Sequence, residues 1–404
     1  MSENCYEQGV VLLKRKHLYE IDLMRAIIMF GVLSVHTMSI FDSQLKGWTM
    51  SSVTMSAIHS SMHVTRMAFM FITGFILFIV YANRDLRIAD FWKKRFLLIG
   101  IPYLFWNIIY LLFQNDYLMH TREPLFQFLN DLWLAFIHGD QFYIYYVLVT
   151  FQFYLVFPFM LRGLQKFKKW HLHVFLWSVY VQLITTVFIK FVLPHLDTSS
   201  WPYLLSHYGV FVVTYQCYFV LGGLAACHYN EICTFIDRHI KLLIGILAVS
   251  WMGMCLHYYL NRVILHESDR AAQSVHQPVY LPYTILIIAL LIFIGRYWAK
   301  RRETGSGPVF NRFVQTASMT SFGMYLAQPF PLYLVGTYFV PYLKVGSLAF
   351  YLSLPLAILF VYAASMLIAY AFYKTPILSY CIGRRSKWPS LKRSKPAALP
   401  EETK

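Results

Sequence analysis

The feature that most constrains this chain is a series of long, continuous apolar segments. Ten of them approach the roughly 20 apolar residues that a helix needs to cross a bilayer. They lie near residues 20–41, 64–82, 96–113, 142–162, 171–193, 209–228, 241–260, 280–298, 319–340 and 348–373. Because the runs are continuous and do not alternate with polar residues, a membrane β-barrel is excluded. The sequence therefore predicts an all-α fold, a polytopic membrane bundle of about ten transmembrane helices.

The composition agrees with a membrane location. Apolar residues make up 58% of the 404 positions and charged residues only 13%, about half the charged share of a soluble domain. The net charge of +16 does not indicate a nucleic-acid partner, because the cations are grouped between the apolar runs. The six cysteines form no CxxC pair, so we expect neither structural disulfides nor a zinc site.

The distribution of lysine and arginine predicts the orientation. With the N-terminus in the cytoplasm, 27 of the 35 cations fall in inner segments and six in outer loops, while Arg25 and Arg66 fall within helices. Cytoplasmic loops carry such an excess, and one missed helix would invert every later loop. We therefore expect both termini to be cytoplasmic, with an N-terminal segment at 1–19, a transmembrane domain at 20–375 and a basic, disordered tail at 376–404.

The first apolar segment contains ionisable residues whose spacing points to a function. Asp22 and Arg25 are three positions apart and can pair on one helical face. His36 follows Arg25 by eleven positions, which is close to three turns, so the two share a face roughly 16 Å apart. A charged face must be directed into the bundle, because lipid does not tolerate it.

We interpret this face as the lining of a path across the membrane. Arg25 is placed to meet an anion from the cytosol, and His36 is placed to move a proton near the outer surface. The structural alternative is a snorkelling arginine and a hydrogen-bonded core histidine.

The start of the second apolar segment also gathers polar side chains on one face. His59, His63 and Arg66 lie at i, i+4 and i+7. Two histidines at this spacing could bind a metal ion, but no third ligand is indicated. Arg66 could stabilise an oxyanion or bind an acidic substrate, or could extend to the membrane interface. Gly74 is expected to allow close helix packing.

The third apolar segment begins with the cations Lys93, Lys94 and Arg95. They could hold the phosphates of a nucleotide-like donor, but the topology rule alone also demands cations at this place. Two outer loops, at residues 42–63 and 114–141, are longer than a tight connection needs, and long loops often carry function. Within the second loop, Leu132 to Ile137 form a half-apolar stretch that we interpret as re-entrant or interfacial.

The sequence also gives evidence against several classes of function. Apart from Asp22, no acidic side chain lies deep in a predicted span, whereas ion-coupled transporters usually carry acidic groups there. The chain contains no P-loop, nucleophile elbow or HExxH motif, so soluble-type ATPase and hydrolase functions have no support.

Four motifs follow one another along the chain. Their residues are Ile21, Asp22, Arg25 and His36; Arg66, Ala68, Phe71, Thr73, Gly74 and Phe75; Lys93, Arg95, Phe96 and Ile101 to Trp106; and Ser321 to Pro329. This ordered set resembles the acyltransferase-3 family, membrane O-acyltransferases of bacterial surface glycans. Two positions depart from the family pattern, because Leu98 stands where a second arginine is frequent and Gln328 where a histidine is frequent.

The resemblance implies an activity and a set of site residues. The donor substrate would be acetyl-CoA or succinyl-CoA, the acceptor a hydroxyl of a surface polysaccharide, and no cofactor would be bound permanently. Cofactor-binding cations would be Arg25, Lys93, Lys94 and Arg95. The catalytic residues would be His36 as general base or acyl carrier, Arg66 at the oxyanion, and Arg25 with Asp22 beside it. The family also implies a bacterial plasma-membrane location.

The segment G-D-Q-F-Y-I-Y-Y-V-L-V-T-F-Q-F-Y-L-V-F-P at residues 139–158 is similar to the branch found in poly-N-acetylglucosamine biofilm loci. Members of that branch are labelled as glycan exporters or as O-succinyltransferases, and a glycan synthase would be a candidate partner. The alternative function is therefore an exporter or flippase for the polysaccharide. An exporter predicts a wide aromatic groove and loss of polymer on deletion, whereas an acyltransferase predicts polymer that lacks acyl groups.

Overall fold

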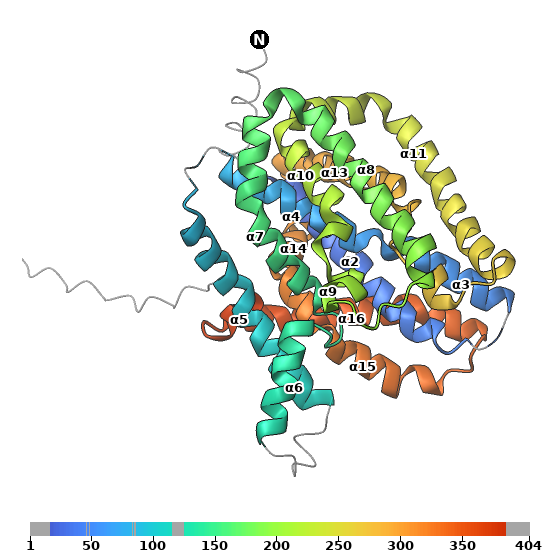
Figure 1. The fold of residues 1–404 in the computed structure, drawn as a ribbon. Helices are drawn as coiled ribbons and strands as arrows, with labels where there is room; N and C mark the ends of the chain where they lie inside the picture. The colour runs from blue at the N-terminus through green and yellow to red at the C-terminus, as the bar shows by residue number, and fades with distance from the viewer. Residues whose placement is uncertain are drawn as a thin grey trace, which may run out of the picture.

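The computed structural model describes residues 17–114, except positions 46, 48, 83 and 85, and residues 125–384. Within these ranges the regular elements are all helical (Figure 1), which confirms the all-α prediction. The predicted N-terminal segment up to residue 16 and the tail from residue 385 lie outside the described residues. The α-helices are α2 (Tyr19–Asp42), α3 (Met50–Ser61), α4 (Thr65–Tyr81), α5 (Ile88–Gln114), α6 (Leu125–His138), α7 (Tyr145–Lys166), α8 (His171–Val187), α9 (Tyr203–Ser206), α10 (Gln216–Cys227), α11 (Tyr229–Tyr259), α12 (Asp269–Ala272), α13 (Tyr280–Glu303), α14 (Pro308–Ala327), α15 (Pro329–Tyr338) and α16 (Leu348–Lys374).

Short helical turns join or extend several of these helices. They are η1 (Met62–Val64), η2 (Lys168–Trp170), η3 (Phe188–Val192), η4 (Leu193–His195), η5 (Tyr208–Val210), η6 (Val212–Tyr215), η7 (Leu260–Ile264), η8 (Val340–Tyr342) and η9 (Leu378–Ile382). Because η1 connects α3 to α4, the helical path from Met50 to Tyr81 is continuous.

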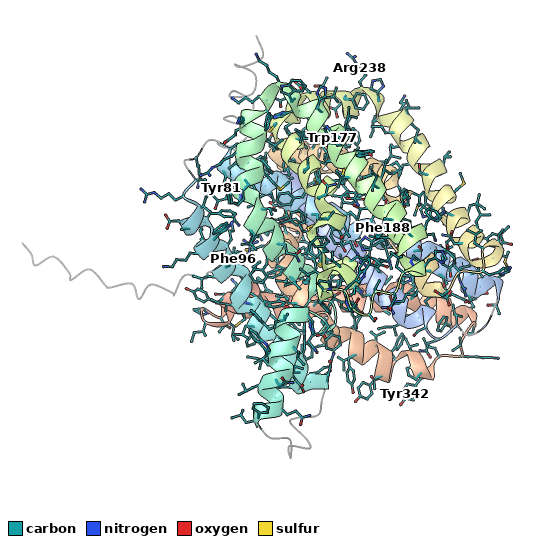
Figure 2. All side chains as sticks on the ribbon, in the orientation of Figure 1. Tyr81, Phe96, Trp177, Phe188, Arg238 and Tyr342 are labelled. Carbon is teal, nitrogen blue, oxygen red and sulfur yellow. The ribbon has the colours of Figure 1, made fainter. Side chains whose placement is uncertain are left out.

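Eight helical stretches among the described residues are long and apolar enough to cross a membrane. They are Tyr19–Asp42, Met50–Tyr81, Ile88–Gln114, Tyr145–Lys166, Lys168–His195, Tyr229–Ile264, Tyr280–Glu303 and Leu348–Lys374. Each contains or overlaps one of the predicted apolar segments. Large apolar side chains also cover the outside of the bundle, as Trp177 (66% exposed) and Phe188 do on the α8 side (Figure 2). The chain is thus a multi-pass membrane protein, while the count of ten spans and the orientation of the termini stay predictions.

The other two predicted spans take different forms. The segment at 209–228 contains a shorter apolar helical stretch, Val212–Cys227. The segment at 319–340 is not one helix, because α14 ends at Ala327 and α15 begins at Pro329. A proline has no N–H to donate to the preceding turn, so Pro329 interrupts the helical hydrogen bonds after Gln328.

Helix α2 lies in the middle of the bundle, where it packs against α4, α13, α14 and α16 (Figure 1). Helix α4 packs more closely against α10 than against α2. A Cβ added to Gly74 would be only 2.3 Å from the carbonyl oxygen of Phe219, and one added to Gly222 would be 2.2 Å from that of Phe71. The predicted packing role of Gly74 is therefore confirmed, because only glycine lets these two backbones approach so closely.

Both long loops contain helices. The loop at 42–63 contains α3, and the loop at 114–141 contains α6, which projects from the bundle in Figure 1. Helix α6 contacts α5, where the Tyr103 hydroxyl donates to the carbonyl of Phe136 (2.8 Å). Trp133, Phe136 and Ile137 are exposed, which is the surface that an interfacial helix needs.

The start of the predicted tail is not disordered. Residues 378–382 form η9, which packs among α5, α14 and α16. The indole N–H of Trp106 on α5 donates to the carbonyl of Cys381 (2.8 Å). The backbone N–H of Arg384 donates to the carbonyl of Ser379 (2.9 Å). The first bond attaches the segment to α5 and the second shapes its turn, and the segment itself, with Ile377, Leu378 and Ile382, is apolar.

Candidate active site

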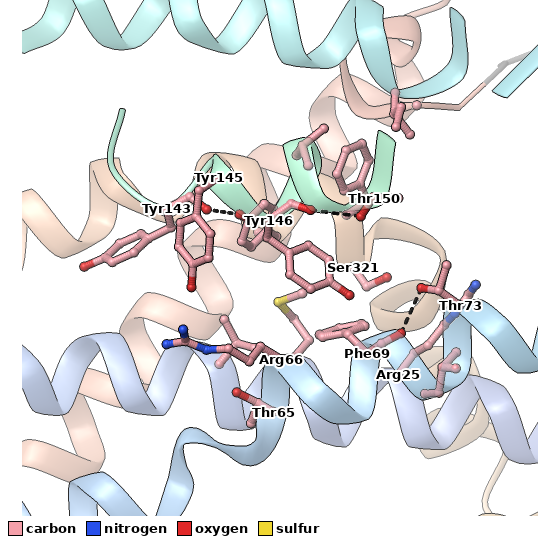
Figure 3. Close-up of a pocket in the computed structure, with 18 of the residues that line it drawn as sticks. Arg25, Thr65, Arg66, Phe69, Thr73, Tyr143, Tyr145, Tyr146, Thr150 and Ser321 are labelled. Carbon is pink, nitrogen blue, oxygen red and sulfur yellow. Dashed lines mark hydrogen bonds between the residues drawn. The ribbon is translucent and has the colours of Figure 1, made fainter. Parts of the chain in front are cut away.

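The main cavity of the bundle lies among α2, α4, α5, α7, α14 and the segment after η9 (Figure 3). Its volume is about 320 Å³. The polar side chains that line it are Arg25, His36, His63, Thr65, Arg66, Thr73, Arg95, Tyr143, Tyr145, Tyr146, Thr150, Tyr154, Ser321, Tyr325 and Arg384. Among these lining residues there are four arginines and no carboxylate. The lining therefore carries an excess of positive charge, which favours an anionic ligand.

Arg25 and His36 both lie in the cavity wall, on the α2 face that their spacing predicts. The imidazole of His36 is stacked on the phenol ring of Tyr143, with 3.6 Å between ring centroids. Among the described residues we find no hydrogen bond to either ring nitrogen of His36. The stacking thus fixes the plane of the ring and leaves its nitrogens available to a ligand. Burial raises the pKa of the Tyr143 hydroxyl to about 12, so this neighbour stays neutral.

Asp22 does not pair with Arg25 as the sequence predicted. Its Oδ1 accepts a hydrogen bond from the Ser318 hydroxyl of α14 (2.7 Å), and its Oδ2 lies 2.7 Å from Nε2 of His17. No ion pair between Asp22 and Arg25 is found in the described part of the chain, and Asp22 does not line the cavity. The carboxylate is directed toward α14, so its role here is to position α2 against that helix.

Arg66 lies beneath the ring of Tyr145, with its guanidinium carbon 5.7 Å from the ring centroid (Figure 3). It also lies beside the hydroxyl of Tyr215 on the neighbouring η6. In Figure 3 Arg66 and Arg25 stand apart along the cavity. The two arginines are therefore available to different parts of one ligand.

Of the predicted cluster at the start of α5, only Arg95 lines the main cavity. Lys93 and Lys94 are exposed, so the three cations do not line one cavity, and their predicted binding of the donor stays a prediction. The reason is helical rotation, since successive residues are turned by about 100°. Lys94 instead lines a second cavity of about 350 Å³ that shares Leu98, Gly383 and Arg384 with the first.

Arg95 is held by aromatic rings. Its guanidinium carbon lies 5.4 Å from the centroid of Tyr81 and 5.7 Å from that of Tyr154. One terminal nitrogen donates to the Tyr81 hydroxyl at 3.4 Å, whereas its buried Nε has no hydrogen-bond partner among the described residues. A buried donor without a partner is costly unless a ligand satisfies it.

Arg384 is the main site residue that the sequence interpretation missed, because it lies in the basic tail. Gly383 turns the chain into the cavity with φ +66°, and a Cβ there would lie 3.0 Å from the carbonyl oxygen of Leu98. The Nε of Arg384 donates to the carbonyl of Met319 (3.0 Å). Burial lowers the pKa of Arg384, and Tyr373 and Asp22 partly oppose that shift. Arg384 also lies within electrostatic range of Arg25.

Several tyrosines were also missed as site residues, although they stand in the quoted segment before and within α7. Tyr143, Tyr145, Tyr146 and Tyr154 line the cavity. Ser321 of α14 also lines it, and its hydroxyl donates to the carbonyl of Ser318 (2.9 Å). The available signal was a cluster of tyrosines in an apolar stretch, but their orientation toward the cavity depends on tertiary packing.

Of the two predicted histidines before Arg66, only His63 lines the cavity. Its Nε2 lies 3.1 Å from Nε2 of His59. In the described part of the chain, no group of three His, Cys, Asp or Glu side chains is arranged to hold a metal ion. The metal alternative thus gains no support.

The comparison with protein families gives one result. A family model described as an acyltransferase domain matches residues 18–374, which include most of the cavity lining and end ten residues before Arg384. No curated protein and no solved structure matches the chain.

Proposed function

The chain belongs to the acyltransferase-3 family, whose domain covers residues 18–374, and from this premise we propose an O-acyltransferase of surface polysaccharide. It moves an acetyl or succinyl group from cytoplasmic acyl-CoA to a sugar hydroxyl. It works in a bacterial plasma membrane and binds no permanent cofactor. The acceptor class includes poly-N-acetylglucosamine, and a glycan synthase is a candidate partner.

One observation carries this proposal: His36 and four arginines line the same cavity, which has no carboxylate among its lining residues. An imidazole with available nitrogens can accept a proton or an acyl group. Guanidinium groups bind phosphate and stabilise oxyanions. Acyl transfer from a CoA thioester needs both kinds of group within one site.

The donor end of the site is proposed to be the cluster of Arg25, Arg95 and Arg384. All three line the cavity, and the electrostatic environment of Arg25 includes the other two. Like charges at short range repel each other unless an anion lies between them. A diphosphate supplies that anion. Lys94 in the adjoining cavity and the exposed Lys93 would attract the donor as it approaches.

The reacting end is proposed to lie between His36 and Arg66. His36 removes the proton from the acceptor hydroxyl, or first carries the acyl group itself. The hydroxyl oxygen then forms a bond to the carbonyl carbon while the C–S bond breaks and the thiolate leaves with the electron pair. Arg66 stabilises the charge that develops on the carbonyl oxygen. Removal of one such stabilising donor costs about 10²–10³-fold in rate.

The test is to replace His36 or Arg25 by alanine in cells and to measure polymer amount and polymer acylation by mass spectrometry. His195→Ala is the matched control, because His195 is exposed and lies outside the cavity lining. The proposal expects normal polymer without acyl groups in both site variants. Normal acylation in folded variants would refute it, and loss of the polymer itself would favour the exporter.

A further inference from the structure

The second cavity, of about 350 Å³, lies between the first turns of α5 and the C-terminal segment at η9. Its lining residues are Lys94, Leu97, Leu98 and Ile101 on α5, and Tyr380, Gly383 and Arg384 on the C-terminal segment. The four residues of α5 stand at i, i+3, i+4 and i+7, so they share one helical face. The cavity is therefore a groove between one face of α5 and the end of the described chain.

The outer wall of this groove belongs to the surface of the bundle, where α5 lies at the edge (Figure 1). Leu97 is 49% exposed, Ile101 is 40% exposed and Tyr380 is 45% exposed. Because α5 is one of the helical stretches that can cross a membrane, such a surface contacts lipid. An empty gap there would lose the dispersion contacts of its walls. The groove therefore favours an occupant with an apolar part.

Two cations also line the groove, Lys94 from α5 and Arg384 from the C-terminal segment. Among the described residues, no carboxylate forms an ion pair with either of them. The hydrogen bond from Arg384 to the carbonyl of Met319 (3.0 Å) starts from Nε and does not use the terminal nitrogens. Cations beside an apolar surface are stabilised by an anion. The occupant should therefore carry a negative charge as well as an apolar part.

The order of these groups along α5 matches that of a lipid. Lys94 comes first, and the apolar side chains up to Ile101 follow over seven residues, a rise of about 10 Å. The predicted orientation places the start of α5 at the cytoplasmic surface. Anionic lipids give that leaflet a negative surface potential, and basic pockets between helices on this side bind their headgroups. A phosphate at Lys94 with a fatty chain toward Ile101 follows the same direction.

We propose that this groove binds one anionic phospholipid of the cytoplasmic leaflet. The headgroup phosphate lies between Lys94 and Arg384, and one fatty chain lies along Leu97 and Ile101. The lipid thus joins the C-terminal segment to α5 beside the main cavity, which Arg384 also lines. This binding does not depend on the proposed acyl transfer, so either proposal can fail without the other.

The test is lipid titration of the purified full-length protein, with native mass spectrometry to measure the number and the affinity of bound lipids. Phosphatidylglycerol and phosphatidylcholine with the same fatty chains are the probes, because they differ in headgroup charge. The proposal expects one tight site for phosphatidylglycerol. Each cation near a membrane surface favours an anionic lipid about fivefold, so two cations should bind phosphatidylcholine about 20-fold more weakly.

The chain offers a matched control for each half of the groove. Lys94→Gln should lower the affinity for phosphatidylglycerol about fivefold, whereas Lys93→Gln should not, because Lys93 is also exposed but lies outside the lining. Ile101→Trp fills the apolar part of the groove and should also lower that affinity. Leu155→Trp changes a similarly exposed side chain (45%) on α7 and should leave it unchanged. Thermal unfolding of each variant verifies the fold.

Several results would overturn the phospholipid site. Equal affinity for the two lipids would show only general contact with the bilayer, and an equal loss in Lys93→Gln and Lys94→Gln would show a general effect of charge. Unchanged affinity in folded Lys94→Gln and Ile101→Trp would place the lipid elsewhere. Displacement of the lipid by an equal concentration of sn-glycerol 3-phosphate would show that the groove binds phosphate without a fatty chain.

Discussion

Arg384 allows the anion site to be tested at a residue that the family domain does not include. In the variant Arg384→Gln the cavity loses one of its four cations. The variant also loses the hydrogen bond from Nε of Arg384 to the carbonyl of Met319 (3.0 Å). In the wild type, the rest of the guanidinium is available to bind a ligand. Hydrogen bonds to charged groups contribute about 1.5–3 kcal/mol. The affinity for the donor phosphates should therefore fall about 10-fold to 100-fold.

The assay is calorimetric binding of coenzyme A and of adenosine 3′-phosphate 5′-diphosphate to the purified protein at two salt concentrations. Both ligands carry phosphates, and only the first carries the pantetheine arm. The expected loss is the same for both, and it becomes smaller at high salt. Lys374→Gln is the matched control, because Lys374 precedes the same C-terminal segment but is exposed and lies outside the cavity lining. Arg384→Lys should retain part of the affinity, since lysine keeps the charge but not the fork of donors.

Equal affinity of wild type and Arg384→Gln, within about twofold, would refute the anion site at this end of the cavity. An equal loss in Arg384→Gln and Lys374→Gln would also contradict it, because it would show a general charge effect. Thermal unfolding of each variant separates loss of binding from loss of the fold.

Two further predictions follow from the packing. Gly74→Ala places a methyl group 2.3 Å from the carbonyl oxygen of Phe219, so it should destabilise the protein by about 1–3 kcal/mol. Thermal unfolding against Gly163→Ala, where nothing lies within 4 Å, measures this, and equal midpoints would disprove the close packing. Tyr143→Ala removes the ring stacked on His36, so kcat should fall about tenfold with unchanged KM for the donor, while Tyr143→Phe stays near wild type. A larger loss of kcat in Tyr143→Phe than in Tyr143→Ala would mean that catalysis depends on the hydroxyl of Tyr143 and not on its ring.

Much of the fold could be predicted because the hydrophobic effect acts on local sequence. Continuous apolar runs identify the long helices, and the eleven-residue spacing of Arg25 and His36 places both side chains on one face of α2. Because lipid does not accommodate ionisable groups, a helix face that carries two of them must be directed into the bundle. Residue periodicity was therefore sufficient for this part of the site.

Other features depend on partners that are distant in sequence. Asp22 is three positions from Arg25, but Ser318 of α14 offers its carboxylate a hydrogen bond across 296 positions. Likewise, the rotation of α5 turns Arg95 inward and Lys94 to the adjoining cavity. Sequence spacing gives the angle between such residues but not which of them faces the core.

The C-terminal segment shows the limit of a composition averaged over a long stretch. Basic residues with proline and serine usually indicate a solvated tail, but a tail predicted from residue 376 includes the apolar stretch Ile377 to Ile382. Residues 378–382 nevertheless form η9, because Trp106 binds the carbonyl of Cys381 and Gly383 adopts a left-handed turn. The apolar residues of this stretch were the local signal for packing, while its place against α5 depends on Trp106, which is distant in the sequence.

The account depends most on Arg25 and His36 lining one cavity that opens toward both membrane surfaces. Cysteine variants at these two positions, made in a background without the six native cysteines, can be treated with membrane-impermeant thiol reagents from either side. The account predicts labelling of the residue 25 variant from the cytoplasm and of the residue 36 variant from outside, with coenzyme A protecting the first. Absence of labelling at both positions from both sides, in folded protein, would contradict it.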